Sequence, residues 1–271
     1  MNTFRFLLLT TFILLSVSAI ADQHRVDQHR VVSVTPVTHL ISKALLDNTG
    51  VTVDLLSPSR LPINRVPAWL RRVDASELTA ADAVLTIESV WPSLELYPTM
   101  RSLNIRTVPI DIASELSPGG ARVLMRPGIA LESEFFWLDL NNLIMMLNIA
   151  ARDLVRLWPE YADQIDSNRL LAHRAIQHTQ IQIDEYLADK PINSISLNDD
   201  RLMPLALSLS LPILSTSEGN AHLYLTMDNV EAEFAIWHAI WQIETLHRLS
   251  AHSLGEWLES LESSLRDALV L

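Results

Sequence analysis

The feature that most constrains the fold is a long helical pattern that runs from Pro159 to about Ala188. It begins at Trp158-Pro159-Glu160, where proline suits the first helical turn because no backbone N–H is needed there. Its apolar residues recur at spacings of 7, 4, 7 and 4, which predicts one narrow buried stripe. The stripe consists of Ile165, Ala172, Ile176, Ile183 and Leu187. At about 1.5 Å per residue the helix would be about 45 Å long, which is enough to cross a molecule with two lobes.

Ahead of this helix, short β-rich runs alternate with helical segments. The first helix is predicted at Val37–Leu46 and ends at Asn48-Thr49-Gly50. The predicted strands are Val31–Thr35, Val51–Leu56, Ala83–Ile87 and Ile105–Ile110. Regular alternation of this kind predicts βαβ units and a parallel sheet, with a ligand site beyond the carboxyl ends of the strands. We expect Pro36, the Ser57–Pro67 loop and the Glu88–Pro92 loop to meet at those ends.

The rest of the chain predicts a second, smaller lobe. An apolar helix at Leu138–Leu157 precedes the long one. After the long helix come a strand at Ile192–Leu197, a short helix at Met203–Leu209, a strand at Pro212–Ser215 and a mainly helical tail from Asn229 to Leu271. We therefore predict an α/β fold in which two lobes with parallel sheets are joined by one long rigid helix. The predicted divisions are an N-terminal α/β lobe at 22–136, a helical region with the linking helix at 137–189, and a shortened C-terminal α/β lobe at 190–271.

The first 21 residues predict a signal peptide that is cleaved after Ala21. Arg5 precedes an apolar run at Phe6–Leu15 that is too short to span a bilayer, and small residues lead up to the cleavage point. The alternative is a retained membrane anchor. No cysteine follows the apolar run, which excludes a lipid anchor of the lipoprotein kind, so we expect a periplasmic protein. The mature chain would open with a tandem Asp-Gln-His-Arg repeat, either a mobile terminus or a metal-capturing one.

The composition and the absence of several motifs exclude several classes of function for this chain. The formal net charge of −12 repels nucleic acid and anionic lipid. With no cysteine, any metal site must use histidine, carboxylate or amide ligands. No nucleophile elbow, phosphate-binding glycine loop or His-Glu-x-x-His motif is present, so we expect no enzymatic activity, with a periplasmic hydrolase as a weaker alternative. No further run reaches membrane length, and we expect a monomer that does not span the membrane.

The order of several short phrases resembles the periplasmic solute-binding proteins of zinc and manganese ABC transporters. The phrases are Val32-Ser33-Val34-Thr35-Pro36, Ala75-Ser76-Glu77-Leu78 with Ala80–Val84, Trp137-Leu138-Asp139 with Asn142, and Trp158-Pro159-Glu160 with Ala162 and Asn168. The resemblance implies two α/β lobes joined by the long helix, limited hinge motion, and a metal held in the cleft by three histidines and one carboxylate. It also implies a membrane permease as partner and no cofactor beyond zinc or manganese as the transported ligand.

The histidines that the resemblance implies are missing. Pro62 is followed by Ile63 and Asn64 where the family has its first histidine. Phe135 stands two residues before the Trp-Leu-Asp phrase, at the second position, and Asn198-Asp199-Asp200 replaces the third, a His-Asp pair. Isoleucine and phenylalanine cannot bind a metal, so the usual histidine-rich zinc site cannot form from these positions.

A later phrase offers a replacement ligand. His222–Asn229 echoes Phe135–Asn142 within the chain and aligns His222 with Phe135. One interpretation places His222 in the cleft as a metal ligand together with Asp199 or Asp200. The alternative is a chance match in a surface loop. Asp199 and His222 are therefore the predicted metal ligands.

Arginines crowd the loop where the family binds metal. They are Arg60, Arg65, Arg71 and Arg72. Guanidinium groups there would oppose a bare cation and favour an anion or a small anionic metal chelate, whereas the alternative is a set of charged residues flanking a surface helix. The sequence thus predicts a periplasmic solute-binding protein of a zinc- or manganese-type ABC importer that captures ligand between its lobes. The alternative is a family-derived accessory protein that binds no metal.

Overall fold

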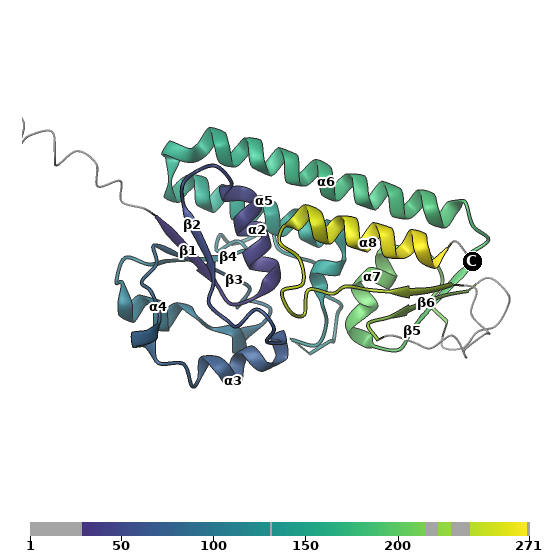
Figure 1. The fold of residues 1–271 in the computed structure, drawn as a ribbon, viewed down its shortest axis with the longest axis horizontal. Coiled ribbons are helices and arrows are strands. Elements are labelled where there is room, and N and C mark those ends of the chain that lie inside the picture. Colours follow the sequence, from purple (N-terminus) through teal and green to yellow (C-terminus); the bar gives the residue numbers. More distant parts are fainter. Residues whose placement is uncertain (1–28, 131, 215–221, 229–238, 270–271) are drawn as a thin grey trace, which may run out of the picture.

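The computed structural model describes residues 29–130, 132–214, 222–228 and 239–269. The predicted signal peptide and the first copy of the Asp-Gln-His-Arg repeat lie outside these residues. Two parallel sheets lie side by side beneath one long helix (Figure 1), as the sequence predicts. Among the described residues, none of the helices combines the length and the apolar character that a bilayer crossing needs.

The N-terminal lobe is built on a four-stranded parallel sheet with the order β2-β1-β3-β4. Its strands are β1 Arg30–Ser33, β2 Thr52–Leu55, β3 Ala83–Thr86 and β4 Val108–Asp111. The Thr35 side chain caps helix α2 (Pro36–Leu46). The last predicted strand begins at Val108 rather than at Ile105, whose side chain is 72% exposed. The short helical elements of this lobe are η1 Ile63–Arg65, α3 Val66–Leu70, η2 Ala75–Glu77, η3 Pro92–Leu94 and α4 Tyr97–Leu103.

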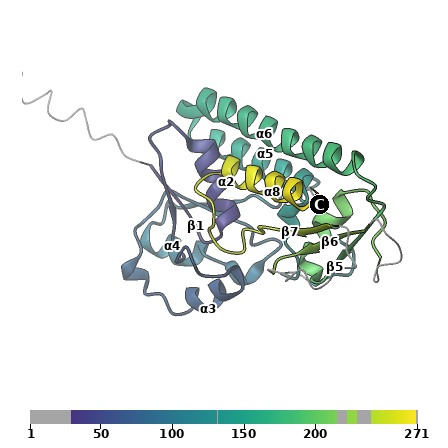
Figure 2. The ribbon, with the colours of Figure 1, turned by 45° about the vertical axis from the view of Figure 1, so that its right-hand side comes forward.

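Two long helices connect this lobe to the next. Residues Phe136–Leu138 form the turn η4, and α5 (Leu140–Leu157) follows. The turn η5 (Pro159–Tyr161) leads into α6 (Ala162–Ala188), which extends along both lobes (Figures 1 and 2). The predicted apolar stripe of α6 faces the protein, since Ile165, Ile176, Ile183 and Leu187 are all buried.

The C-terminal lobe has a three-stranded parallel sheet with the order β5-β6-β7. Its strands are β5 Ser194–Leu197, β6 His222–Thr226 and β7 Ala239–Gln242. The turn η6 (Asp200–Leu202) and helix α7 (Met203–Ser208) follow β5. Helix α8 (Leu254–Ala268) packs between α6 and this sheet, and its start lies near α2 of the other lobe (Figure 2).

Two predictions for this lobe need correction. The predicted strand at Pro212–Ser215 is reduced to one isolated parallel bridge between Ile213 and Ile195, with two backbone hydrogen bonds to Ile195, and Ser215 lies outside the described residues. Of the predicted helical tail, residues 229–238 lie outside the described residues, Ala239–Gln242 forms a strand, and helix α8 begins at Leu254. The buried positions Ala239, Trp241 and Ile243 recur every second residue, which is the period of a strand.

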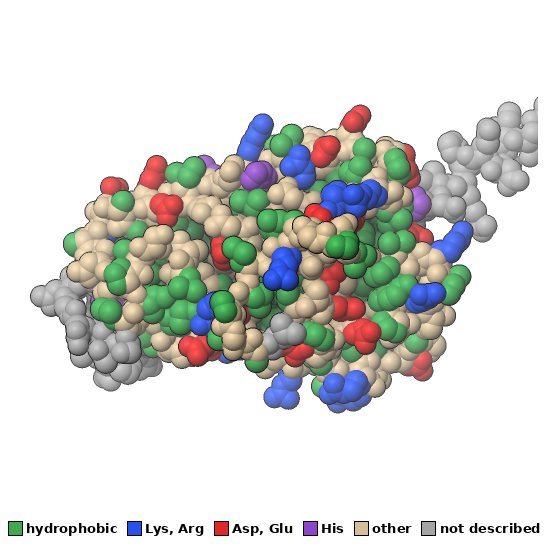
Figure 3. All heavy atoms as spheres, turned by 180° about the vertical axis from the view of Figure 1, so that it is seen from behind, with side chains coloured by type: hydrophobic (Ala, Val, Ile, Leu, Met, Phe, Trp, Pro, Cys, Tyr) green, Lys and Arg blue, Asp and Glu red, His purple; other side chains and the backbone are tan. Residues whose placement is uncertain are grey.

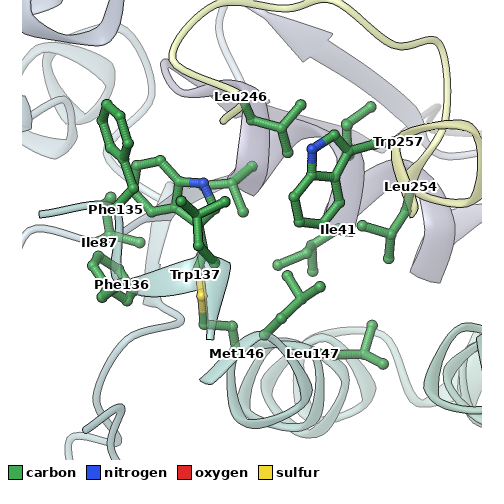
Figure 4. Packing of buried hydrophobic residues seen from close by; sticks show 14 of the residues in the cluster. Ile41, Ile87, Phe135, Phe136, Trp137, Met146, Leu147, Leu246, Leu254 and Trp257 are labelled. Carbon is green, nitrogen blue, oxygen red and sulfur yellow. The ribbon is translucent and has the colours of Figure 1, made fainter. Parts of the chain in front are cut away.

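One hydrophobic core runs through both lobes. Figure 4 shows Phe135 and the η4 residues Phe136 and Trp137 packed near Ile87 and Met146, with Leu246 and Trp257 of the C-terminal lobe on the side of Ile41. The Trp137 indole Nε1 donates to the Thr245 carbonyl at 2.9 Å, which ties the turn between the lobes to the loop after β7. On the face opposite that of Figure 1, hydrophobic side chains lie exposed among charged ones (Figure 3).

Candidate functional site

A cleft of about 370 Å³ lies between the two lobes. It is lined by Pro62, Ile63, Asn64, Arg65, Arg201, Met227, Asp228, His247 and Arg248. The first four follow β2, and the others follow β5, β6 and β7 in the second sheet. The cleft therefore lies beyond the carboxyl ends of parallel strands in both lobes, where α/β sheets place their ligands. Of the segments expected at this edge, the Ser57–Pro67 loop lines the cleft.

Backbone hydrogen bonds join the two lobes beside the cleft. The Ile63 N–H donates to the His247 carbonyl at 2.7 Å, and the Leu249 N–H donates to the Ser59 carbonyl at 3.0 Å. The loop after β7 thus holds the loop after β2 by two backbone hydrogen bonds. These bonds fix the relative position of the lobes at the cleft and oppose a wide opening.

Arg201 is held firmly from the C-terminal lobe. Its Nε donates to Asp199 Oδ1 at 2.9 Å and its Nη2 donates to Asp199 Oδ2 at 2.6 Å. The Phe135 ring lies 5.3 Å from Arg201 Cζ, at a cation–π distance. Hydrogen bonding from Arg201 lowers the pKa of Asp199, and the same bond raises the pKa of Arg201. Both groups are therefore charged at neutral pH, and Nη1 of Arg201 makes no hydrogen bond to a described residue.

His247 is a neutral imidazole whose two nitrogens are both engaged. Arg248 Nε donates to His247 Nε2 at 2.8 Å, so the proton is on Nδ1, which lies 2.9 Å from Thr245 Oγ1. Burial lowers the pKa of His247, and the positive charge of Arg248 lowers it further. Because the Nε2 lone pair already accepts from Arg248, His247 is not set up to bind a metal.

The three places where the family resemblance implies histidines do converge near this cleft. Ile63 lines it, and Phe135 is buried beneath Arg201, with its N–H donating to the Arg201 carbonyl at 3.1 Å. Asn198 Nδ2 donates to Thr226 Oγ1 at 3.3 Å within the C-terminal lobe. Apart from the segments that the structure does not describe, no group of three or more His, Asp or Glu residues is placed to hold a metal ion.

The predicted ligands Asp199 and His222 do not come together. His222 is opposite Ser194 at the start of the paired strands, and its Nδ1 lies 2.8 Å from Ser194 Oγ. Asp199 follows the far end of β5, five residues beyond Ser194, so it is separated from His222 by roughly 16 Å along the strand direction at about 3.3 Å per residue. His222 is buried in β6 rather than exposed in a surface loop, and burial lowers its pKa. The geometry therefore gives these two side chains no shared metal.

Of the four arginines predicted near the site, only Arg65 lines the cleft. Arg60, Arg71 and Arg72 are exposed outside it, and Arg72 Nε donates to the Ala68 carbonyl at the end of α3. Arg60, Arg71 and Arg72 are therefore charged surface residues, whereas Arg65 lies where a ligand in the cleft would contact it.

The acidic residues at the ends of β3 and β4 support loops instead of lining the cleft. Glu88 accepts from the Leu96 N–H at 2.9 Å, and Asp111 accepts from the Ser89 N–H at 2.7 Å. Burial raises the pKa of both carboxyl groups.

In the second copy of the tandem repeat, His29 is held against the body of the protein. Its ring stacks on Trp158 with 4.9 Å between ring centroids and lies 3.7 Å from Asp82 and 3.5 Å from Glu160. The first copy lies outside the described residues. For His29, these contacts give a packing role at the start of the N-terminal lobe.

Sequence reasoning missed four charged or titratable cleft residues: Arg201, Asp228, His247 and Arg248. Arg201 directly follows Asn198-Asp199-Asp200, so its position beside the third family site was visible in the sequence. His247 and Arg248 carried no such signal, because the tail was expected to be helical. The cleft thus contains three guanidinium groups, those of Arg65, Arg201 and Arg248, and one carboxylate, that of Asp228. Such a lining suits a small anion better than a bare cation.

The sequence matches no family model, and it shows no significant similarity to any curated protein. The structure is similar to the zinc-bound ZnuA-like domain of AdcA from Streptococcus pneumoniae, with 12% identity, a TM-score of 0.64, and coverage of 90% of this chain and 100% of that one. Against the longer AdcA chain, the protein spans only 58% of that chain's length.

Two further solved structures have the same architecture. The solute-binding protein FpvC from Pseudomonas aeruginosa, in complex with Mn²⁺, is 11% identical with a TM-score of 0.63, covering 90% of this chain and 97% of that one. The metal-dependent lipoprotein YcdH from Bacillus subtilis is 14% identical with a TM-score of 0.62, covering 89% and 99%. The fold is therefore that of zinc- and manganese-binding solute-binding proteins.

Proposed function

We propose that the protein is a periplasmic solute-binding protein of a zinc- or manganese-type ABC importer, which captures its ligand in the interlobe cleft and delivers it to a membrane permease. The observation that carries this proposal is a cleft of about 370 Å³ at the carboxyl ends of both sheets, in the fold of metal-binding solute receptors. Its size is in the range of small-molecule sites. The solved neighbours are solute-binding proteins, which supports a role without catalysis.

The proposal is tested by what the purified full chain retains. We expect native mass spectrometry of protein isolated from its own periplasm to show one small solute per chain. Chelator-treated protein that is reloaded with zinc or manganese and analysed for metal should take up little bare cation, because the cleft holds three arginines. A protein that retains neither a solute nor a metal would contradict the receptor proposal. If the wild type does take up metal and His222→Ala does not, the result would instead support His222 as a metal ligand.

Export is tested separately. The mature chain is expected to begin at Asp22, which N-terminal sequencing of the periplasmic fraction would show directly. A chain that retains Met1–Ala21 and sediments with membranes would support the anchored alternative.

The alternative function is an accessory protein of the periplasm that has lost its ligand. Two observations favour it: the described residues lack a metal-binding cluster, and backbone hydrogen bonds already tie the lobes together. The retention experiment separates the two functions, because an accessory protein would carry no solute.

A further inference from the structure

We propose that the ligand of the interlobe cleft is a small polycarboxylate, carried as its complex with a divalent metal, and that Arg65, Arg201 and Arg248 bind its carboxylate groups. This inference rests on the proposed function and adds the chemical class of the solute. The family-type site would hold the metal by protein ligands, whereas here the protein would hold the chelator that surrounds the metal.

Charge is the first support. The molecule carries a formal net charge of −12, yet guanidinium groups outnumber carboxylates by three to one in the cleft lining. Even when Asp199 behind Arg201 is counted, the positive charges are in excess. Arg65 and Arg248 are exposed, and no acidic side chain within the described part of the chain forms an ion pair with either. Two guanidinium groups are thus available to a bound anion.

The origin of the three arginines is the second support. Arg65 belongs to the N-terminal lobe, whereas Arg201 and Arg248 follow β5 and β7 of the C-terminal lobe. A ligand with several carboxylate groups can engage arginines of both lobes at once, one carboxylate for each guanidinium. Carboxylates also match the planar, paired donors of guanidinium.

Preorganisation is the third support. Asp199 and the Phe135 ring hold Arg201 in place and leave its Nη1 for a ligand. The hydrogen bond from Arg248 Nε to His247 fixes the inner end of the Arg248 guanidinium group. Held donors lose little conformational freedom on binding, which favours affinity. Asp228 is the one carboxylate in the lining and offers an oxygen ligand to a metal inside the chelate.

Isothermal titration calorimetry of the full mature chain tests the inference with three probes: zinc alone, citrate alone and premixed zinc–citrate. We expect zinc–citrate to bind most tightly, citrate more weakly, and zinc alone not measurably. Arg65→Gln and Arg248→Gln should each weaken zinc–citrate binding by about tenfold or more, because each removes one charge-assisted hydrogen-bonding group. Raising the salt concentration should weaken binding as well.

Matched controls are Arg71→Gln and Arg72→Gln, which remove the same charge from exposed positions outside the cleft and should change the affinity less than twofold. Thermal unfolding of every variant checks that it is folded.

Equal loss of affinity in the control and cleft variants, or tight binding of zinc alone, would overturn the inference. If a retained native solute is displaced by neither citrate nor zinc–citrate, the inference fails and the receptor function stands. If the protein neither retains a solute nor binds any probe, both fail.

Discussion

The two lobes are attached to the same helix by different kinds of contact. At its N-terminal half, α6 contributes the buried Asn168, whose Nδ2 donates to the carbonyls of Leu45 and Asp47 at 2.9 and 2.8 Å. These bonds satisfy carbonyl groups at the end of α2, which has no following turn of helix to do so. At its C-terminal half, α6 meets α8 through apolar packing, with a polar contact at the edge between Tyr186 and Glu262.

The difference indicates which attachment is specific and which is adaptable. A buried amide with two backbone partners fixes one register between α2 and α6, since any slip leaves carbonyl groups without donors. Apolar contacts between α6 and α8 tolerate small shifts at low cost. We therefore expect the N-terminal lobe to be rigid on the helix and any ligand-linked adjustment to occur in the C-terminal lobe, which supplies Arg201 and Arg248 to the cleft.

The largest expected effect comes from removing the anchor of the N-terminal lobe. Asn168→Ala should lower the free energy of unfolding by about 4 kcal/mol, because two carbonyl groups lose their donor. Urea denaturation monitored by circular dichroism measures it. Gln177→Ala, at an exposed position on the same helix, is the control and should have almost no effect. A loss below about 1 kcal/mol for Asn168→Ala would remove the distinction between the lobes.

A second prediction concerns acid sensitivity in the N-terminal lobe. His39 of α2 is buried, and its Nδ1 has no hydrogen-bond partner among the described residues. Burial, with a further contribution from Lys43, lowers the pKa of His39 from 6.5 to about 4. The unfolded chain therefore binds a proton at a higher pH than the folded chain does. Stability from this residue is complete above about pH 6.5 and is lost as the pH falls toward 4.

The measurement compares unfolding free energies at pH 7 and pH 4. The loss on acidification should be about 3 kcal/mol smaller in His39→Leu than in the wild type. His252→Leu replaces an exposed histidine just before α8 and serves as control, with little expected change in the acid-induced loss of stability. Identical acid sensitivity in His39→Leu and the wild type would show that His39 is not the responsible group.

The smallest effect should come from the polar contact of the C-terminal lobe. Tyr186→Phe removes the 3.3 Å hydrogen bond to Glu262 and should cost less than about 1 kcal/mol of unfolding free energy, because water replaces the lost partner at this partly buried position. Thermal unfolding detects such a change. A loss as large as that of Asn168→Ala would mean that both lobes are fixed by specific polar contacts.

The sequence predicted the N-terminal lobe better than the C-terminal one. Runs such as Val31–Thr35 and Ala83–Ile87 are short, β-rich and separated by helical segments, so local pattern identified them. Trp241 lies in the tail that was predicted to be helical, but it belongs to β7, where its partner across the sheet is Leu225 of β6. His222 was placed near Asp199 by a local echo of sequence, whereas strand pairing puts it opposite Ser194.

The linking helix, the first sheet and the absence of histidine at three expected positions could all be predicted from the sequence, because each depends on residue type and local period. Which charged residues share the cleft depends on how the two lobes fold. Arg65, Arg201 and Arg248 meet there although they are far apart in the chain. Parallel strands require long crossover connections, so the loops at one edge of a sheet come from distant segments, and no local pattern records their meeting.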